Sequence, residues 1–209
     1  MKKLLTILIF AVLTALPVRA AETADAEKFA RDLADNIMTN VVRPKIPLSE
    51  KQAAFRKYFM TAINVKTNAR FTLGQYAKTA DPDQLAAYTD ALADNIIYTW
   101  TDRFNSYAGD SLNNDAITFE STRKSEKGEF YVNSKIRLPN AENDVRIIWR
   151  ISDKKGELKL ADLVVEGVSM LMSYRNEYTA VLQQNGGDIA ALIRMLKEKN
   201  DQIRKPAGK

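Results

Sequence analysis

The spacing of apolar and polar residues changes along the chain, and the clearest change occurs at Gly167. Over residues 158–166 apolar side chains roughly alternate with charged ones, which is typical of a strand with one buried face. Beyond Gly167 they recur at every third or fourth residue, as along one face of a helix. Because Ser169 is a good helix cap, we predict a strand that enters a helix through a tight glycine corner. The residues expected to face inward from this helix are Leu171, Tyr174, Tyr178, Val181 and Leu182.

Two helices are predicted near the start of the chain. Over residues 25–42 apolar side chains recur every four residues, which favours an amphipathic helix. Ser49 and Gln52 have the spacing of a capping box, so we predict a second helix capped by Ser49. One face of this helix is strongly aromatic and contains Phe55, Tyr58 and Phe59.

A long helix is predicted after a less regular segment. Over residues 64–79 the pattern is weak, and we expect either a short helix or two loosely joined helical turns. Asp81 followed by Pro82 marks a helix start, because aspartate caps helices and proline is tolerated at the first helical position. The helical periodicity then continues as far as Gly109.

From residue 114 onwards the pattern has a period of two, which predicts strands. The first includes Ile117 and Phe119, and two more cover residues 130–138 and 145–151. The strand before Gly167 is the fourth, and the short turns between them favour antiparallel pairing. A final helix, capped by Asp188, should bury Ile189, Leu192, Ile193 and Leu196.

This order of elements predicts an α+β fold, with a curved antiparallel four-stranded sheet and several helices packed on one face. We expect helices up to about residue 110, the sheet over about 114–167 and C-terminal helices over about 169–203. With 209 residues, 45% of them hydrophobic, the chain can form one domain with a substantial core.

The first 20 residues have the composition of a secretory signal peptide. A basic start at Lys2 and Lys3 is followed by a short apolar run and by small residues before Ala20, where we place the cleavage. The apolar run is too short to span a bilayer comfortably, and no later run approaches the ~20 residues of a spanning helix. We therefore expect an exported, soluble domain over residues 21–209.

Charge and composition exclude several classes of function. Removal of Lys2, Lys3 and Arg19 with the signal peptide lowers the 31 basic residues to 28, against 26 acidic residues. This balance argues against a nucleic-acid partner. The chain contains no histidine and no cysteine, which excludes the usual His-dependent nucleophiles and thiolate chemistry. We expect no cofactor and no metal site.

Several segments of the sequence resemble the MlaC-like, or toluene-tolerance auxiliary, family. The C-terminal segments that carry the resemblance are residues 162–169, 173–178 and 187–196, and similar residues stand at 55–59, 73–74 and 107–109. Proteins of this family are periplasmic phospholipid carriers that serve an ABC transporter. The resemblance implies an NTF2-like curved sheet with an added helical subdomain, a monomer, and no enzymatic activity. It also implies a glycerophospholipid ligand and, as partners, an outer-membrane lipoprotein complex and an inner-membrane ABC transporter complex with its substrate-binding component.

The large number of apolar residues on the predicted helices and strands could line a cavity between them. An ordinary filled core has the same composition, and the family resemblance is what favours a cavity. The lipid-binding candidates are Tyr58, Phe59, Ile63, Phe71, Tyr76, Leu92, Ile96, Tyr107, Val132, Ile147, Trp149, Val165, Val168, Leu171 and Arg175.

The charged candidates have alternative interpretations. Arg175 could bind a lipid phosphate, although we favour an ion pair with Glu166, Asp162 or Glu177. Asp162 and Glu166 could act as an acid–base pair, although structural roles are favoured. One alternative to a phospholipid carrier is an NTF2-like enzyme acting on a hydrophobic small molecule, which needs a carboxylate buried among apolar residues. The family resemblance implies a second alternative, a carrier of a hopanoid-like polycyclic lipid.

Overall fold

The structure, a computed structural model, describes residues 22–106, 116–138 and 142–204. The predicted signal peptide, the predicted helix end at Gly109 and the candidate Tyr107 lie outside these residues. The helices are α1 (Thr23–Ile37) with its π-helical continuation η1 (Met38–Val42), α2 (Leu48–Ala62), α3 (Val65–Leu73) with the 3₁₀ turn η2 (Gly74–Lys78), α4 (Pro82–Ser106), α5 (Met170–Gln184) and α6 (Ile189–Arg204).

The strands form one antiparallel sheet in the order β1-β2-β3-β4-β5. They are β1 (Ile117–Lys124), β2 (Phe130–Ile136), β3 (Val145–Lys154), β4 (Glu157–Val165) and β5 (Val168–Ser169). The first four match the predicted strands. The two-residue β5 is an addition, which forms because Glu166 (φ 48°) and Gly167 (φ 81°) turn the chain back along β4.

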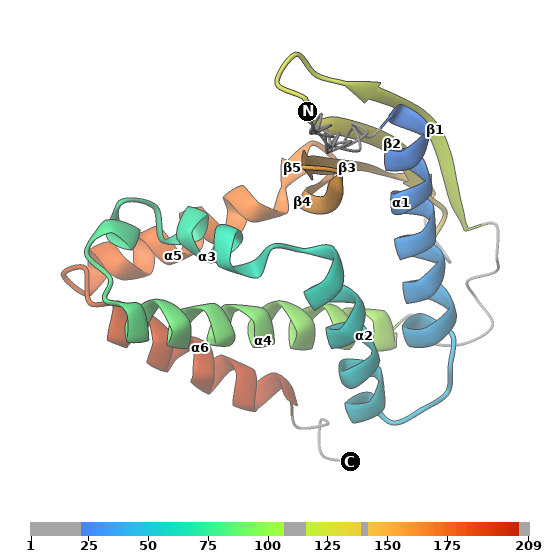
Figure 1. Cartoon of the computed structure of the whole chain (residues 1–209). Helices are drawn as coiled ribbons and strands as arrows, with labels where there is room; N and C mark the ends of the chain where they lie inside the picture. The colour runs from blue at the N-terminus through green and yellow to red at the C-terminus, as the bar shows by residue number, and fades with distance from the viewer. Residues whose placement is uncertain (1–21, 107–115, 139–141, 205–209) are drawn as a thin grey trace, which may run out of the picture.

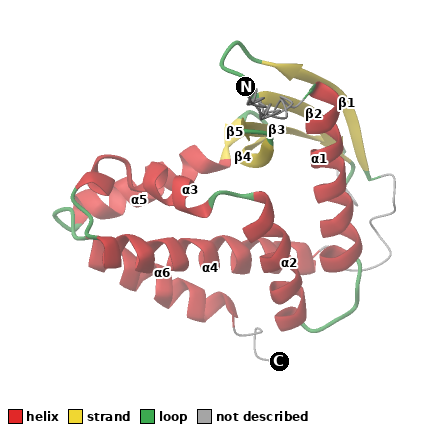
Figure 2. Ribbon diagram, viewed as in Figure 1, coloured by secondary structure: helices red, strands yellow, loops and turns green. Residues whose placement is uncertain are grey.

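The sheet and the helices form two adjoining parts. Figure 1 shows α1 lying across one face of the sheet, while α3, α4, α5 and α6 stack beside it as a helical unit. The sheet lies at one end of the molecule, and α2 runs between α1 and α4 (Figure 2). These packings confirm the α+β fold with an added helical subdomain.

Each part has its own buried core. Between α1 and the sheet the core includes Ala30, Phe130 and Ile151. In the helical unit it includes Leu92 and Tyr178, together with the apolar face predicted for α6. A partly enclosed space lies between the sheet and the helices, separate from the residues of these cores that are fully buried.

Local capping signals explain most helix starts. Ser169, Asp81 and Asp188 accept backbone N–H hydrogen bonds at distances of 3.0, 2.7 and 2.8 Å, as their residue types predict. The capping box predicted for Ser49 and Gln52 is wrong. Pro47 occupies the position just before the helix, where a proline is tolerated. The helix α2 therefore begins at Leu48, and Ser49 lies inside it.

Lys51 is a buried cation at the corner between η1 and α2. Its side chain is only 1% exposed, and its ammonium donates a hydrogen bond to the carbonyl oxygen of Val42, 3.2 Å away. Burial lowers the pKa of Lys51, because the charged form loses hydration. The native state therefore releases this proton more readily than the unfolded chain does.

We predict that Lys51→Met raises the free energy of unfolding by about 1 kcal/mol at pH 7, because a buried charge is replaced by an apolar chain of similar length. This advantage should shrink as the pH rises from the lowered pKa towards about 10.4, where the unfolded lysine also becomes neutral. Urea unfolding at several pH values measures the difference, with Lys57→Met on the exposed face of α2 as the control. A difference in unfolding free energy between Lys51→Met and the wild type that does not vary with pH would contradict the lowered pKa of Lys51.

Candidate functional site

A partly enclosed cavity of about 580 Å³ lies between the sheet and the helices. Its size is typical of pockets that hold small organic ligands. The helical wall consists of Leu33, Ala34 and Ile37 from α1, Met38 and Val42 from η1, Phe55, Phe59 and Ala62 from α2, Asn68 from α3, Ile96, Trp100, Arg103 and Phe104 from α4, and Met170, Leu171 and Tyr174 from α5.

The sheet wall is supplied by strands β1 to β4 and by two connecting segments. It consists of Ile117, Ile136, Val145, Ile147, Trp149, Leu160, Ala161, Asp162, Leu163 and Val165, with Ile63 and Leu138 from the connections. Nearly all of these side chains are apolar. The cavity is therefore suited to hydrocarbon and offers few polar groups to a ligand.

Strand register places the central sheet residues side by side. Ile147 is opposite Val165, and Trp149 is opposite Leu163, so these side chains share the face that borders the cavity. The indole N–H of Trp149 donates to the hydroxyl oxygen of Ser134, 2.9 Å away. Because this hydrogen bond satisfies its polar atom, Trp149 can present an apolar surface to the cavity.

Across the cavity from the sheet, the helical wall contains a cluster of aromatic residues between α2 and α4. Ile96, Trp100 and Phe104 are spaced four residues apart, so they lie along one face of α4. Phe104 meets Phe55 of α2 edge to face, with ring centroids 5.5 Å apart. Phe59 lies one turn further along α2 and continues the same wall.

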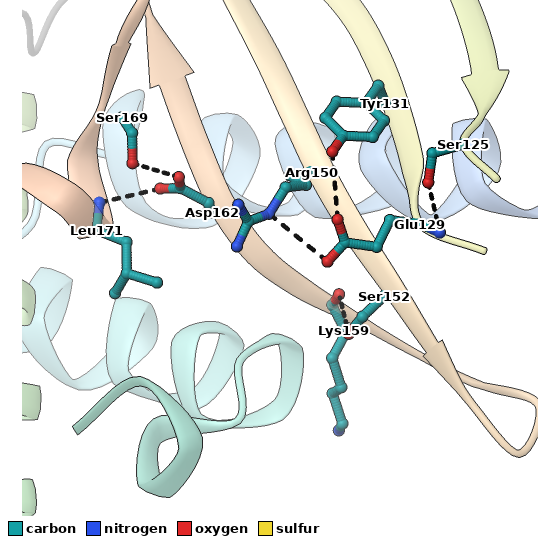
Figure 3. A network of polar contacts seen from close by, with 9 residues as sticks. All are labelled: Ser125, Glu129, Tyr131, Arg150, Ser152, Lys159, Asp162, Ser169 and Leu171. Carbon is teal, nitrogen blue, oxygen red and sulfur yellow. Dashed lines mark hydrogen bonds and ion pairs between the residues drawn. The ribbon is translucent and has the colours of Figure 1, made fainter. Parts of the chain in front are cut away.

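Asp162 is a buried carboxylate where β4 meets the start of α5. It is 6% exposed, and its Oδ1 accepts the backbone N–H of Leu171 at 3.0 Å. Its Oδ2 accepts the hydroxyl hydrogen of Ser169, as Figure 3 shows. Both oxygens thus fasten the first turn of α5 to the sheet, which positions the part of the wall formed by Leu171.

The second carboxylate of the predicted acid–base pair lies apart from the cavity. Glu166 accepts the backbone N–H of Arg146 and pairs with its guanidinium. The hydrogen bond from the backbone of Arg146 is the main reason that the pKa of Glu166 is lowered. Asp162 and Glu166 therefore have separate hydrogen-bond partners within the protein, as the favoured interpretation expects.

A further polar network lies on the sheet near Asp162. The guanidinium of Arg150 is 3.9 Å from a carboxylate oxygen of Glu129, and the hydroxyl of Tyr131 donates to the same carboxylate at 3.2 Å (Figure 3). Neither Arg150 nor Glu129 belongs to the cavity wall. This network supports pairing of β2 with β3 and takes no direct part in the cavity.

The structure brings part of the candidate set together at the cavity. The candidates in its wall are Phe59, Ile63, Ile96, Ile147, Trp149, Val165 and Leu171. They come from α2, α4, α5, β3, β4 and the α2–α3 connection, so only the folded chain assembles them.

Other candidates lie outside the wall. Leu92 and Val132 are fully buried in the two cores, and Tyr76 packs against the core that contains Leu92. Tyr58 packs against the cores around α1 and α2, whereas Val168 is 53% exposed on β5. The candidates that pack in or against the cores share one physical cause, because an apolar stripe looks the same in sequence whether it meets another element or an open space.

Arg175 and Phe71 form a contact that the sequence did not predict. The guanidinium of Arg175 lies over the ring of Phe71, 4.8 Å from its centroid, and neither residue borders the cavity. Among the described residues the predicted ion pair of Arg175 does not form. Its proposed partner Glu177 instead pairs with Lys199 at 3.2 Å.

The wall also contains residues that were not among the candidates. Trp100 and Phe104 continue the stripe of Ile96, so helical spacing could have identified them. Met38 and Val42 belong to η1, whose π geometry changes which side chains face inward. Arg103 gave no signal in the sequence, because one basic residue on a helix is usually only a solvated charge.

Two further observations concern the described residues only. They contain no cluster of three or more acidic side chains that could hold a metal ion. Within the same ranges, every helix is too short or too polar to cross a bilayer.

Comparison with known proteins identifies relatives of this fold. A solved structure of a phospholipid-binding protein from Ralstonia solanacearum, in complex with a phospholipid, superposes with a TM-score of 0.73 at 18% sequence identity. The match covers 86% of this chain and 99% of that chain. It shows that the two proteins share a fold.

Sequence comparison gives the same relationship. The intermembrane phospholipid transport system binding protein MlaC of Haemophilus influenzae is 25% identical over 198 residues, which is 90% of this chain and 89% of the relative. The family model of the MlaC protein matches residues 28–198. The match spans most of the sequence, including both the sheet and the helical unit, and the chain therefore belongs to the MlaC family.

Proposed function

We propose that this protein is a periplasmic phospholipid carrier that holds the acyl chains of a glycerophospholipid in the cavity between sheet and helices. The observation that carries the proposal is the almost entirely apolar wall of that cavity. The name of the Haemophilus relative and the phospholipid bound to the Ralstonia protein support it. Among the candidate residues, those in the wall are the proposed acyl-chain contacts.

The energy of exposed hydrocarbon explains why a carrier needs such a cavity. At ~0.8 kcal/mol per methylene, a lipid with about 30 methylenes has on the order of 20 kcal/mol of unfavourable hydration. A protein that carries it through water must cover most of both chains. The headgroup can remain hydrated, which agrees with a wall that has few polar side chains.

We further propose that the carrier shuttles lipid between an outer-membrane lipoprotein complex and an inner-membrane ABC transporter. The signal-like residues 1–20 would direct export, leaving residues 21–209 as a single domain in the periplasm. The relative's name, which places it in an intermembrane transport system, supports this role. Helices that pack on a sheet can separate slightly, which would let the cavity load and unload.

An enzymatic function gains little support from the buried carboxylate. Asp162 is the kind of group that such an enzyme would need, because it is buried and borders an apolar cavity. Its two oxygens, however, accept hydrogen bonds from Ser169 and Leu171 at the start of α5. This arrangement favours a capping role over proton transfer to a ligand.

Native mass spectrometry of the protein purified from the periplasm tests the proposal. We expect an added mass equal to one two-chain phospholipid, released unchanged when the protein is denatured. The mass of a polycyclic lipid would instead support the hopanoid-like alternative. A bare chain that converts an added hydrophobic substrate would support the enzyme and contradict the carrier.

A second experiment separates binding from transport. Donor vesicles containing a fluorescent phospholipid are mixed with unlabelled acceptor vesicles, and the rate of lipid exchange is measured with and without the protein. A carrier should accelerate exchange in proportion to its concentration. If the protein retained bound lipid without accelerating exchange, storage would be supported and shuttling contradicted.

A further inference from the structure

The cavity wall contains two charged residues among those that the structure describes, Asp162 and Arg103. Asp162 is buried, and its carboxylate oxygens accept hydrogen bonds from the first turn of α5. Arg103, near the end of α4, is exposed to solvent, whereas the other described wall residues are buried or half-buried. Arg103 therefore marks a place where the apolar wall meets water.

The surroundings of Arg103 hold its guanidinium beside the cavity. It lies over the ring of Trp100, 5.3 Å from the ring centroid, and Trp100 is itself part of the wall. Tyr174 of α5 borders the cavity as well. Burial raises the pKa of Tyr174, while a hydrogen bond with Trp100 and the charge of Arg103 act in the opposite direction, so the three side chains form one local group.

We propose that Arg103 binds the phosphate of the lipid at the mouth of the cavity. This inference rests on the proposed carrier function, and it assigns the headgroup end of the ligand to the side of the cavity formed by α4 and α5. A phosphate joins the glycerol close to the point where the two acyl chains begin. When the chains lie against the apolar wall, the phosphate must therefore lie where that wall reaches water.

Arginine has suitable chemistry for this position. Its planar guanidinium can stack on an aromatic ring while the N–H groups at its edge point towards phosphate oxygens. Because Arg103 is exposed, its guanidinium is in contact with water and can be reached by a headgroup at the surface. The same exposure limits the strength of the contact, which should increase affinity several-fold without determining whether lipid binds.

The test compares two lipids with identical acyl chains, phosphatidylglycerol and diacylglycerol, of which only the first carries a phosphate, within its phosphoglycerol headgroup. Extraction of each tail-labelled lipid from vesicles is measured with wild type, Arg103→Ala and Arg103→Lys. Arg70→Ala, which removes an exposed arginine of α3 away from the cavity wall, is the matched control. We expect Arg103→Ala to weaken phosphatidylglycerol binding about fivefold and to leave diacylglycerol binding unchanged.

Two further results complete the test. Arg103→Lys should recover part of the affinity, and the difference between wild type and Arg103→Ala should decrease at high salt, because an exposed ion pair is screened. Equal weakening for both lipids, or no weakening, would overturn the assignment of Arg103 while leaving the carrier function intact. Failure of the wild-type protein to extract either lipid would instead contradict the proposed function.

Discussion

Val165→Glu is expected to yield a folded protein that carries almost no lipid. Val165 lies in the sheet wall opposite Ile147, where an acyl chain would pack. A carboxylate at this position would have to lose its hydration whenever hydrocarbon filled the cavity, at a cost of several kcal/mol. We therefore predict that the fraction of protein with bound phospholipid, measured by native mass spectrometry, falls at least about tenfold.

Val164→Glu is the matched control for this variant. Val164 is the preceding residue of the same strand and is also half-buried, but it is not part of the cavity wall. Successive side chains of a strand point to opposite faces, so this change places the same charge on the other side of the sheet. Normal lipid content in the Val165→Glu protein, or equal loss in both variants, would be incompatible with lipid held against this wall.

Asp162→Ala should be the most destabilising of the proposed substitutions. The change removes the acceptor for the backbone N–H of Leu171, which is buried, and for the hydroxyl of Ser169. An unsatisfied buried donor and the loss of a charged acceptor together cost about 3 kcal/mol. Because Asp162 fastens α5 to β4, this loss should appear as a lower free energy of unfolding in urea.

Two related variants show whether the hydrogen bonds account for this effect. Ser169→Ala removes one hydrogen bond to Asp162 and the acceptor for the N–H of Met172, and should cost about 1 kcal/mol. Asp162→Asn keeps one acceptor oxygen, so its loss of unfolding free energy should lie between those of Ser169→Ala and Asp162→Ala. A loss below about 0.5 kcal/mol for Asp162→Ala would show that the carboxylate contributes little to the attachment of α5.

Local signals in the sequence predicted the secondary structure well, because caps and turns depend on neighbouring residues. Asp81, Ser169 and Asp188 each cap the expected helix. Ser49 does not, because Pro47 occupies the capping position and α2 begins two residues earlier than a cap at Ser49 would place it. The antiparallel pairing of the first four strands in chain order also followed from the alternating pattern and the short turns.

The cavity could be predicted only in part, because it depends on how distant segments approach one another. Leu92 and Ile96 lie one turn apart on α4, yet Leu92 is buried in the helical unit and Ile96 borders the cavity. The apolar pattern of α1 predicted a buried face without showing that Leu33 and Ile37 face an open space. Arg103 required the folded structure, since its significance comes from its position beside Trp100.

Photo-crosslinking with a phospholipid that carries a diazirine near the end of one acyl chain tests most directly whether the cavity holds hydrocarbon. After illumination and digestion, the labelled residues are identified by mass spectrometry. We predict labels on residues of the cavity wall, such as Ile96, Trp149 and Val165. Labels confined to exposed apolar residues outside that wall, such as Met60, Val168 and Met172, would contradict the account.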